Sequence, residues 1–252
     1  MQEMFDLSNK VAIVTGCNTG LGQGMALALA NAGADIVGVN RSVPTETIEL
    51  MAKTGRKFHS VIADMSKLDS VDLVMKEAVL AFGKVDILVN NAGIIRRNDA
   101  IDFTEKDWDD VMDLNIKAVF FMSQGFAKQI MAQGTGGNII NIASMLSYQG
   151  GIRVPSYTAS KSGVMGVTRL MANEWAQHGI NVNGIAPGYM ATDNTSALRA
   201  DEDRSSEILG RIPAGRWGTP GDMAGPIVFL ASEASRYVNG YTIAVDGGWL
   251  AR

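Results

Sequence analysis

Three side chains within the segment 144–161 could move a proton on and off an oxygen atom. Tyr157 and Lys161 lie four residues apart in SYTASKSG, where a helix is predicted, so the phenol and the ammonium share one helix face. Ser144 closes an apolar segment that is typical of a buried strand. Tyr157 could exchange a proton with an alcohol or ketone oxygen, while Ser144 donates a hydrogen bond to that same oxygen.

The spacing alone does not make Tyr157 acidic enough to work near neutral pH. A free tyrosine titrates near pH 10, and lowering its pKa to about 7 takes roughly 4 kcal/mol, at about 1.36 kcal/mol per pKa unit. An exposed ion pair contributes only about 0.2 to 1 kcal/mol. We therefore expect Lys161 to act in a partly desolvated site, with help from a second positive charge.

Seven short apolar segments rich in Val and Ile predict the strands that position these residues. They are residues 10–16, 34–39, 59–64, 85–93, 138–144, 181–188 and 241–248. Segments of helical period lie between them, for example 22–32, 70–82, 108–132 and 157–177. This alternation predicts one α/β domain over residues 1–252, a Rossmann-type doubly wound sheet of seven parallel strands with helices on both faces.

The segment 189–218 interrupts this alternation. It contains charged, small and Pro residues and has no strand pattern. Its length exceeds that of an ordinary connection, so we expect it to form a substrate loop or lid.

A glycine-rich turn follows the first predicted strand, at the sheet edge where ligands bind in such folds. Its glycines allow a tight turn, bring backbone N–H groups to a pyrophosphate and let the next helix pack on the strand. The turn could be purely structural, and its spacing differs from Gly-x-Gly-x-x-Gly, but its position favours a dinucleotide site. The expected contacts are Gly16, Asn18, Thr19, Gly20, Leu21 and Gly22.

The end of the second predicted strand bears on the choice between NAD(H) and NADP(H). Folds of this kind usually carry an Asp or Glu there for the ribose hydroxyls, or an Arg where a 2′-phosphate is held. This chain has Asn40 and Arg41 instead. Arg41 could meet a phosphate, or could stack on adenine or face solvent, so both cofactors remain open.

Further cofactor contacts are expected after the third and fourth predicted strands. Asp64 could accept a hydrogen bond from the adenine amino group, or could simply cap a helix. The run Asn90-Asn91-Ala92-Gly93 offers amides and a glycine where adenosine and ribose should pass, so we expect Asn91, Ala92 and Gly93 to contact the cofactor.

The bulk composition argues against several classes of function. A formal net charge of −4, with no run of Lys or Arg, does not favour nucleic-acid binding. The segment MQEMFDLSNK lacks an apolar core and the apolar runs are too short to span a bilayer, so we expect no signal, anchor or membrane partner. The single cysteine, Cys17, fits a reducing compartment and a cytoplasmic location. Since no cluster has metal-ligand spacing, we expect no metal.

These motifs together resemble the short-chain dehydrogenase/reductase family over the whole chain. The resemblance rests on residues 16–22 and 90–93 and on Asn115, Ser144, Tyr157, Lys161, Pro187, Gly188 and Thr192. It implies an NAD(P)-dependent oxidoreductase acting on CH–OH groups, with NAD as the more usual cofactor. It also implies that Asn115 anchors a proton-relay water behind Lys161 and that Thr192 holds the nicotinamide carboxamide. The further cofactor contacts that we expect are Asn40, Arg41, Met65, Tyr157, Lys161, Pro187, Gly188 and Met190. Asn115 alone would be only a tolerated polar residue in an apolar helix.

A closer resemblance concerns the substrate. The segments NNAGIIRR, DWDDVMDLNIK, IPAGRWG and VDGGWLAR resemble the 2-dehydro-3-deoxy-D-gluconate 5-dehydrogenases, also called 2-deoxy-D-gluconate 3-dehydrogenases, of uronate and pectin degradation. This implies a sugar-acid substrate whose C5 alcohol and ketone are interconverted. It also implies a homotetramer built through the helices 108–132 and 157–177.

An acid substrate needs a cation near Tyr157. Arg153 precedes it by four residues and could bind a carboxylate, with Arg96 and Arg97 as supplements. Each arginine could instead pair with an acid at a subunit interface. Gln149 and Tyr148 could hydrogen-bond sugar hydroxyls.

Three other functions share parts of this pattern. A gluconate 5-dehydrogenase would use the same residues on a related acid, and a 3-ketoacyl reductase would act on an acyl carrier protein. That acidic partner favours a basic surface, whereas this chain is acidic overall. A nicotinamide-binding redox sensor without chemistry would have no need of the Ser, Tyr and Lys set.

Overall fold

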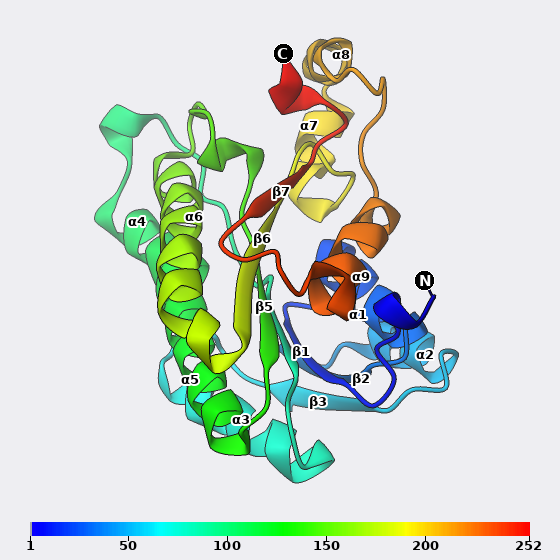
Figure 1. Ribbon diagram of the computed structural model, residues 1–252. Coiled ribbons are helices and arrows are strands. Elements are labelled where there is room, and N and C mark those ends of the chain that lie inside the picture. The colour runs from blue at the N-terminus through cyan, green and yellow to red at the C-terminus, as the bar shows by residue number, and fades with distance from the viewer. Residues whose placement is uncertain (1) are drawn as a thin grey trace.

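The computed structural model describes residues 2–252, and its centre is one parallel sheet with the strand order β3-β2-β1-β4-β5-β6-β7 (Figure 1). The strands are β1 (Val11–Thr15), β2 (Asp35–Asn40), β3 (Phe58–Ile62), β4 (Ile87–Asn90), β5 (Gly137–Ile142), β6 (Ile180–Pro187) and β7 (Thr242–Val245). Each lies within or overlaps one predicted segment. The prediction of a seven-stranded doubly wound parallel sheet is therefore confirmed.

Helices cover both faces of the sheet (Figure 1). One layer holds α1 (Gly20–Asn31), α2 (Thr45–Ala52) and α9 (Ala224–Ala231), and the other holds α3 (Asp69–Phe82), α4 (Glu105–Met112), α5 (Ala118–Gln133) and α6 (Pro155–Trp175). Among residues 2–252, none of these helices combines the length and apolar character that a membrane span requires.

The strand residues alternate between two hydrophobic cores. On β1, Val11 and Ile13 face the core under α3, α5 and α6, whereas Ala12 and Val14 face the core under α1 and α9. All four are buried. Burial on both faces explains why the strands are almost continuously apolar in sequence.

The predicted helical segment 108–132 is helical throughout, but it contains an irregular turn that the sequence did not predict. The structure has α4, then a turn of π-helix over Asp113–Lys117, then α5. Asn115 lies in this turn and its side chain bonds to the backbone of Ile94 in the loop after β4. Single π turns inside helices are frequent at functional sites.

The segment 189–218 lies above the carboxyl ends of the strands (Figure 1) and contains two short helices that the sequence analysis did not predict. They are α7 (Ser196–Ala200) and α8 (Glu202–Arg211). The side chain of Asp201 caps α8, and Ile208 is buried against Trp249 near the C-terminus. Met190 and Gly218 form an isolated parallel β-bridge, which joins the two ends of the segment.

Candidate active site

One cavity of about 630 Å³ runs along the carboxyl edge of the sheet. It reaches from the glycine turn and the end of β2 to the residues that follow β5 and β6. Of the predicted cofactor contacts, the following line it: Gly16, Asn18, Thr19, Gly20, Leu21, Gly22, Asn40, Arg41, Met65, Asn91, Ala92, Gly93, Tyr157, Lys161, Pro187, Gly188, Met190 and Thr192. The fold therefore gathers residues from across the whole chain into one place.

The glycine turn has the shape of a cradle for an anionic group. Gly16 and Gly20 have φ angles of +66° and +59°, in the left-handed region that favours glycine. A Cβ atom on Gly22 would overlap the carbonyl oxygen of Gly16. The Thr19 side chain does not cap α1, so the first backbone N–H groups of that helix are free to bind phosphate oxygens.

The amide of Asn91 supports this turn. Its Nδ2 donates to the carbonyl oxygens of Thr15 at 3.0 Å and Gly16 at 2.8 Å. Asn90 is buried in the sheet and donates to Ser123 and Asn141. Both amides thus bind protein atoms, and Asn91 holds the shape of the glycine turn that lines the cavity.

At the end of β2, Asn40 is fixed and Arg41 is exposed. Asn40 Oδ1 accepts from the backbone N–H of Cys17 at 2.8 Å. Asp64 does not line the cavity; its carboxylate accepts from the backbone and hydroxyl of Ser66, at 3.0 and 2.8 Å. These bonds, with the charge of Arg41, hold the pKa of Asp64 below its usual value. Asp64 therefore has the contacts of a turn cap.

Lys161 is the buried cation of the site. Its Nζ donates to the carbonyl oxygen of Ile142, the last residue of β5, at 2.6 Å and lies 5.7 Å from the centre of the Tyr157 ring. Burial lowers the pKa of Lys161 to about 8. The predicted desolvation of the lysine is thus present in the structure.

The Tyr157 phenol experiences opposing influences. Burial raises its pKa above the usual value, while a hydrogen bond with Ser144 and the positive charge of Arg97 lower it. Ser144 is buried, and its Oγ accepts from the backbone N–H of Leu146 at 3.2 Å. In the protein alone the phenol is therefore protonated near neutral pH.

Asn115 stands behind this group. Its Oδ1 accepts from the N–H of Ile94 at 2.8 Å, and its Nδ2 donates to the carbonyl oxygen of Ile94 at 2.9 Å and to Ser160 Oγ at 3.4 Å. The side chain does not line the cavity. It connects the loop after β4 to α6, one residue before Lys161.

The side chains expected to bind substrate have other partners. Arg153, which is 61% exposed, pairs with Asp99 at 3.1 Å, and Arg96 pairs with Asp107 and Asp110. Gln149 accepts from Trp249 Nε1 at 3.2 Å, and the Tyr148 hydroxyl donates to Thr242 O at 3.1 Å. None of these four side chains lines the cavity.

Arg97 has a different environment. Arg97 does not line the cavity either, but its guanidinium donates to the carbonyl oxygen of the lining residue Asn194 at 3.1 Å, and its charge lowers the pKa of Tyr157. Within residues 2–252 it forms no ion pair, whereas Arg96 beside it binds two carboxylates of α4. We expected Arg97 only as a supplement. The sequence signal that could have separated the two arginines is the pair Asp107 and Asp110, one helical turn apart, which occupies Arg96.

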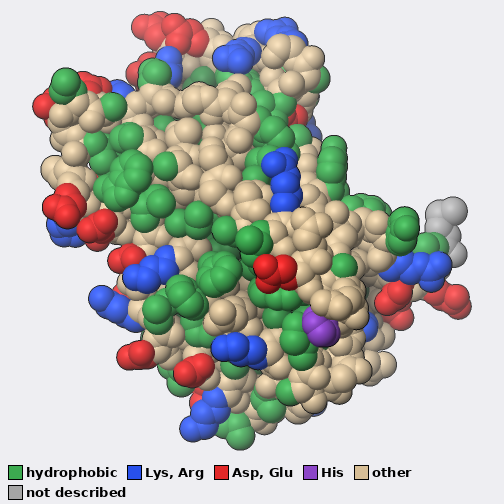
Figure 2. All heavy atoms as spheres, turned by 60° about the vertical axis from the view of Figure 1, so that its left-hand side comes forward, with side chains coloured by type: hydrophobic (Ala, Val, Ile, Leu, Met, Phe, Trp, Pro, Cys, Tyr) green, Lys and Arg blue, Asp and Glu red, His purple; other side chains and the backbone are tan. Residues whose placement is uncertain are grey.

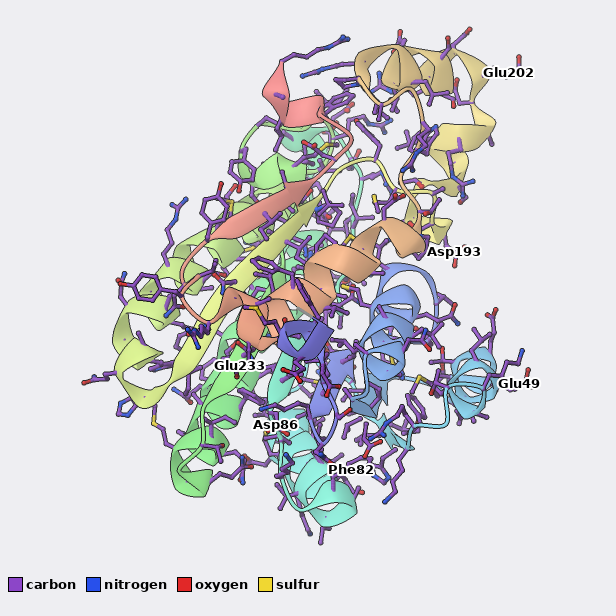
Figure 3. The ribbon with its side chains drawn as sticks, turned by 45° about the vertical axis from the view of Figure 1, so that its right-hand side comes forward. Glu49, Phe82, Asp86, Asp193, Glu202 and Glu233 are labelled. Carbon is purple, nitrogen blue, oxygen red and sulfur yellow. The ribbon has the colours of Figure 1, made fainter. Side chains whose placement is uncertain are left out.

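No group of three or more metal-ligating side chains is assembled anywhere in the described part of the chain. One carboxylate, Asp193, does stand at the rim of the cavity, beside α1 (Figure 3).

Comparison with known proteins agrees with this geometry. The family model described as enoyl-(acyl carrier protein) reductase matches residues 16–250. The 2-dehydro-3-deoxy-D-gluconate 5-dehydrogenase of Escherichia coli (strain K12) is 73% identical over 248 residues, covering 98% of this chain and 98% of that protein. The chain belongs to the short-chain dehydrogenase/reductase family.

The chain is also similar to solved structures that carry provisional names of sugar-acid dehydrogenases. One from Agrobacterium tumefaciens, provisionally named a 2-deoxy-D-gluconate 3-dehydrogenase and holding NADP, is 55% identical, covers 99% of each chain and has a TM-score of 0.92. Another from Beutenbergia cavernae, provisionally named an NAD(P)-dependent gluconate 5-dehydrogenase, is 46% identical with a TM-score of 0.94, covering 99% of this chain and 100% of that one. The roles that the family resemblance gives to Asn115 and Thr192 remain predictions.

Replacing Gly22 with Ala should weaken cofactor binding. The added Cβ meets the Gly16 carbonyl oxygen and Asn91 Nδ2, so the turn must open. We expect the Kd for the reduced cofactor, measured by its fluorescence, to rise at least about tenfold, which corresponds to about 1.4 kcal/mol. Gly166→Ala is the matched control, since a Cβ on this helical glycine meets no atom within 4 Å. Equal cofactor affinities for the two variants would contradict the interpretation of the glycine turn as a phosphate-binding site.

Replacing Lys161 with Met should remove activity yet raise thermal stability at pH 7. The folded-state pKa of about 8 lies below the ordinary 10.5, so below pH 8 the fold carries the cost of a buried charge. That cost is roughly 3 kcal/mol, and the lost bond to Ile142 offsets about 1 to 2 kcal/mol of it.

The gain in Tm should shrink as pH rises from 8 toward 10.5, because the buried lysine of the wild type becomes neutral over this range. Thermal unfolding of the wild type and of Lys161→Met at pH 7 and at pH 10 measures how the gain in Tm changes with pH. A Tm at pH 7 below that of the wild type would show that the lysine is not a buried charge.

Proposed function

We propose that this protein is a dehydrogenase that interconverts the C5 alcohol and ketone of 2-dehydro-3-deoxy-D-gluconate, using NAD(H) or NADP(H). The observation that carries the proposal is the group of buried Ser144, partly buried Tyr157 and buried Lys161 at one end of the cavity. Arg97, which forms no ion pair within residues 2–252, is bonded to the lining residue Asn194 and lowers the pKa of Tyr157 by its charge. The 73% identical relative named for this reaction supports the substrate, as does the related activity named for the Agrobacterium structure.

In oxidation, Tyr157 takes the proton of the substrate hydroxyl while the carbinol carbon loses a hydride, and in reduction both transfers run backward. A bound nicotinamide would accept or supply that hydride, and its oxidised form would add a positive charge to the site. The Ser144 hydroxyl holds the substrate oxygen in both directions. Lys161 supplies a positive charge at the buried end of the site and is positioned to bind the nicotinamide ribose.

The end of β2 accepts either cofactor. Asn40 presents an amide where an acidic side chain would repel a 2′-phosphate, and Arg41 adds a positive charge at the cavity wall. Asp64 offsets part of that charge, since it lies close enough to feel Arg41. The NADP held by the Agrobacterium structure supports acceptance of NADP(H), whereas family resemblance favours NAD(H).

The substrate carboxylate requires a cation at a distance from the reacting carbon. Arg97 meets this need better than Arg153, because Asp99 already neutralises Arg153. The guanidinium of Arg97 is held at the cavity edge by Asn194 and influences Tyr157 electrostatically. We therefore assign it the C1 carboxylate, with Arg153, Arg96 and Gln149 as outer residues.

The segment 189–218 is the proposed lid. Its first residues line the cavity, and the bridge between Met190 and Gly218 holds its two ends together. Such a segment can close over substrate without moving the sheet.

A second candidate is gluconate 5-dehydrogenase, which is favoured by the name given to the Beutenbergia structure. Gluconate carries the same carboxylate and a C5 hydroxyl, so Arg97 and Tyr157 would serve it equally. In a redox sensor or an acyl carrier protein reductase, Arg97 would have no sugar-acid carboxylate to bind.

We propose a homotetramer in the cytoplasm. Trp108 on α4, Met131 on α5 and Leu170 on α6 are exposed apolar side chains, and Figure 2 shows groups of hydrophobic side chains among scattered charges on this side. Sedimentation of the intact protein tests the tetramer. The composition supports the location, since the single cysteine, Cys17, leaves the chain without an internal disulfide, as is usual in a reducing compartment.

Steady-state kinetics with 2-dehydro-3-deoxy-D-gluconate and with gluconate, each with NAD and NADP, test the substrate. We expect the first acid to have the higher kcat/KM. Negligible rates with both acids would contradict the substrate, though not the family.

Replacing Tyr157 with Phe should abolish turnover, because the variant loses the general acid–base group that we assign to the substrate oxygen, and Ser144 only donates a hydrogen bond there. The loss in kcat should be at least about 10² to 10⁴-fold, the usual contribution of general acid–base catalysis. The cofactor Kd should stay within about twofold, since the phenyl ring still fills the same space. Substantial activity in Tyr157→Phe would refute the mechanism.

Replacing Arg97 with Ala should raise KM for the sugar acid by about ten- to a hundredfold, as expected when a charged hydrogen bond worth about 1.5 to 3 kcal/mol is lost. Arg153→Ala is the control and should change KM less than about threefold, because its charge is exposed and already paired. A larger effect at Arg153 would restore the sequence-based assignment.

A further inference from the structure

Ser147 lies outside the cavity but touches two catalytic residues through their backbones. Its Oγ accepts from the backbone N–H of Ser144 at 3.3 Å and donates to the carbonyl oxygen of Lys161 at 2.7 Å. A serine hydroxyl has one proton to donate and lone pairs to accept with, and Ser147 uses both capacities on these two residues. It therefore joins the turn after β5 directly to α6.

The same turn sets the direction of the Ser144 hydroxyl. Ser144 and Ser147 form a reciprocal cap on the turn Met145–Ser147, in which Leu146 donates its N–H to Ser144 Oγ. Because the N–H of Leu146 occupies a lone pair of Ser144 Oγ, the hydroxyl proton of Ser144 is free to point at the substrate oxygen. Losing the Ser147 hydroxyl would remove one half of this cap.

Both the side chain and the backbone of Lys161 are bonded to the region where β5 ends and the following turn begins. Its Nζ donates to the carbonyl oxygen of Ile142 at the end of β5. Its backbone carbonyl oxygen accepts from the hydroxyl of Ser147, in the turn that follows β5. Since Tyr157 is one helical turn before Lys161, these two bonds also fix the phenol relative to Ser144.

We propose that Ser147 is a positioning residue that holds Ser144 in line with Tyr157 and Lys161 for proton transfer. This inference rests on the proposed function, because it assigns Ser147 to the same reaction. Ser147 contacts neither substrate nor cofactor space, so its effect reaches the reaction through Ser144 and α6.

The position of Ser144 affects the pKa of Tyr157 in a definite direction. The groups that act on the phenol are Ser144 from the turn, Lys161 from its own helix and Arg97 from the loop after β4. The Ser144 hydrogen bond favours the phenolate and lowers the pKa of Tyr157. Displacing Ser144 should therefore move the ionisation that governs oxidation to higher pH.

The test compares Ser147→Ala with Ser156→Ala and Ser147→Thr. Ser156 is a matched control, since it is fully buried beside Tyr157 and its hydroxyl has no partner in the part of the chain that the structure covers. Ser147→Thr keeps a hydroxyl and should therefore retain a kcat close to that of the wild type. We expect Ser147→Ala to lower kcat about ten- to a hundredfold, the scale of a small misplacement of a catalytic group.

The pH profile of kcat for oxidation and the cofactor KM distinguish positioning from general damage. The proposal requires the lower pH limb to shift upward in Ser147→Ala, with the cofactor KM within about twofold of wild type. An unchanged kcat and profile, an equal loss in Ser156→Ala, or a parallel rise in cofactor KM would overturn it.

A second readout separates this inference from the substrate assignment. Tyrosinate absorbance, titrated with oxidised cofactor bound and corrected with Tyr157→Phe, reports the phenol without any substrate. A higher pKa of Tyr157 in Ser147→Ala supports the positioning role even if the wild type turns over neither sugar acid. An unaltered pKa excludes that role.

Discussion

The buried ammonium of Lys161 is the constraint around which the active site is arranged. Its side chain leaves water and finds one strong acceptor, the carbonyl oxygen of Ile142 at 2.6 Å. A charge in such a place destabilises the folded state, which is why the pKa of Lys161 falls to about 8. The sheet must supply the acceptor at the right point, so the end of β5 and the start of α6 are fixed relative to each other.

The remaining catalytic groups follow from that arrangement. Ser144 continues from β5 just past the acceptor, and Tyr157 precedes Lys161 by one helical turn. The turn between them is tied to α6 by Ser147, and Asn115 ties α6 to the loop after β4. Because each contact joins segments far apart in sequence, the geometry depends on the completed fold. The phenol stays neutral in the protein alone, a state that suits proton donation.

Charge pairing separates structural arginines from the arginine that is available to an anion. Arg153 and Arg96 are neutralised by neighbouring carboxylates, whereas Arg97, within residues 2–252, binds a carbonyl oxygen at the cavity edge and no carboxylate. At the other end of the cavity, Arg41 stays exposed while Asn40 supports the glycine turn. Within residues 2–252, each end thus has an arginine without an ion pair: Arg41 in the cavity wall and Arg97 beside the lining residue Asn194.

Much of this protein could be predicted from its sequence, because the signals are local. Nearly continuous apolar runs predicted the seven strands, and the alternation with helices predicted the doubly wound sheet that places Gly16, Tyr157 and Lys161 at one edge. The spacing of Tyr157 and Lys161 fixed their common face. The π turn at Asn115 and the helices of the segment 189–218 escaped because long-range contacts, to Ile94 and Trp249, stabilise them against a weak local pattern. Only the tertiary structure decided which arginine is free and what Asp64 binds, since the partners of a long side chain depend on distances in space that spacing along the chain does not encode.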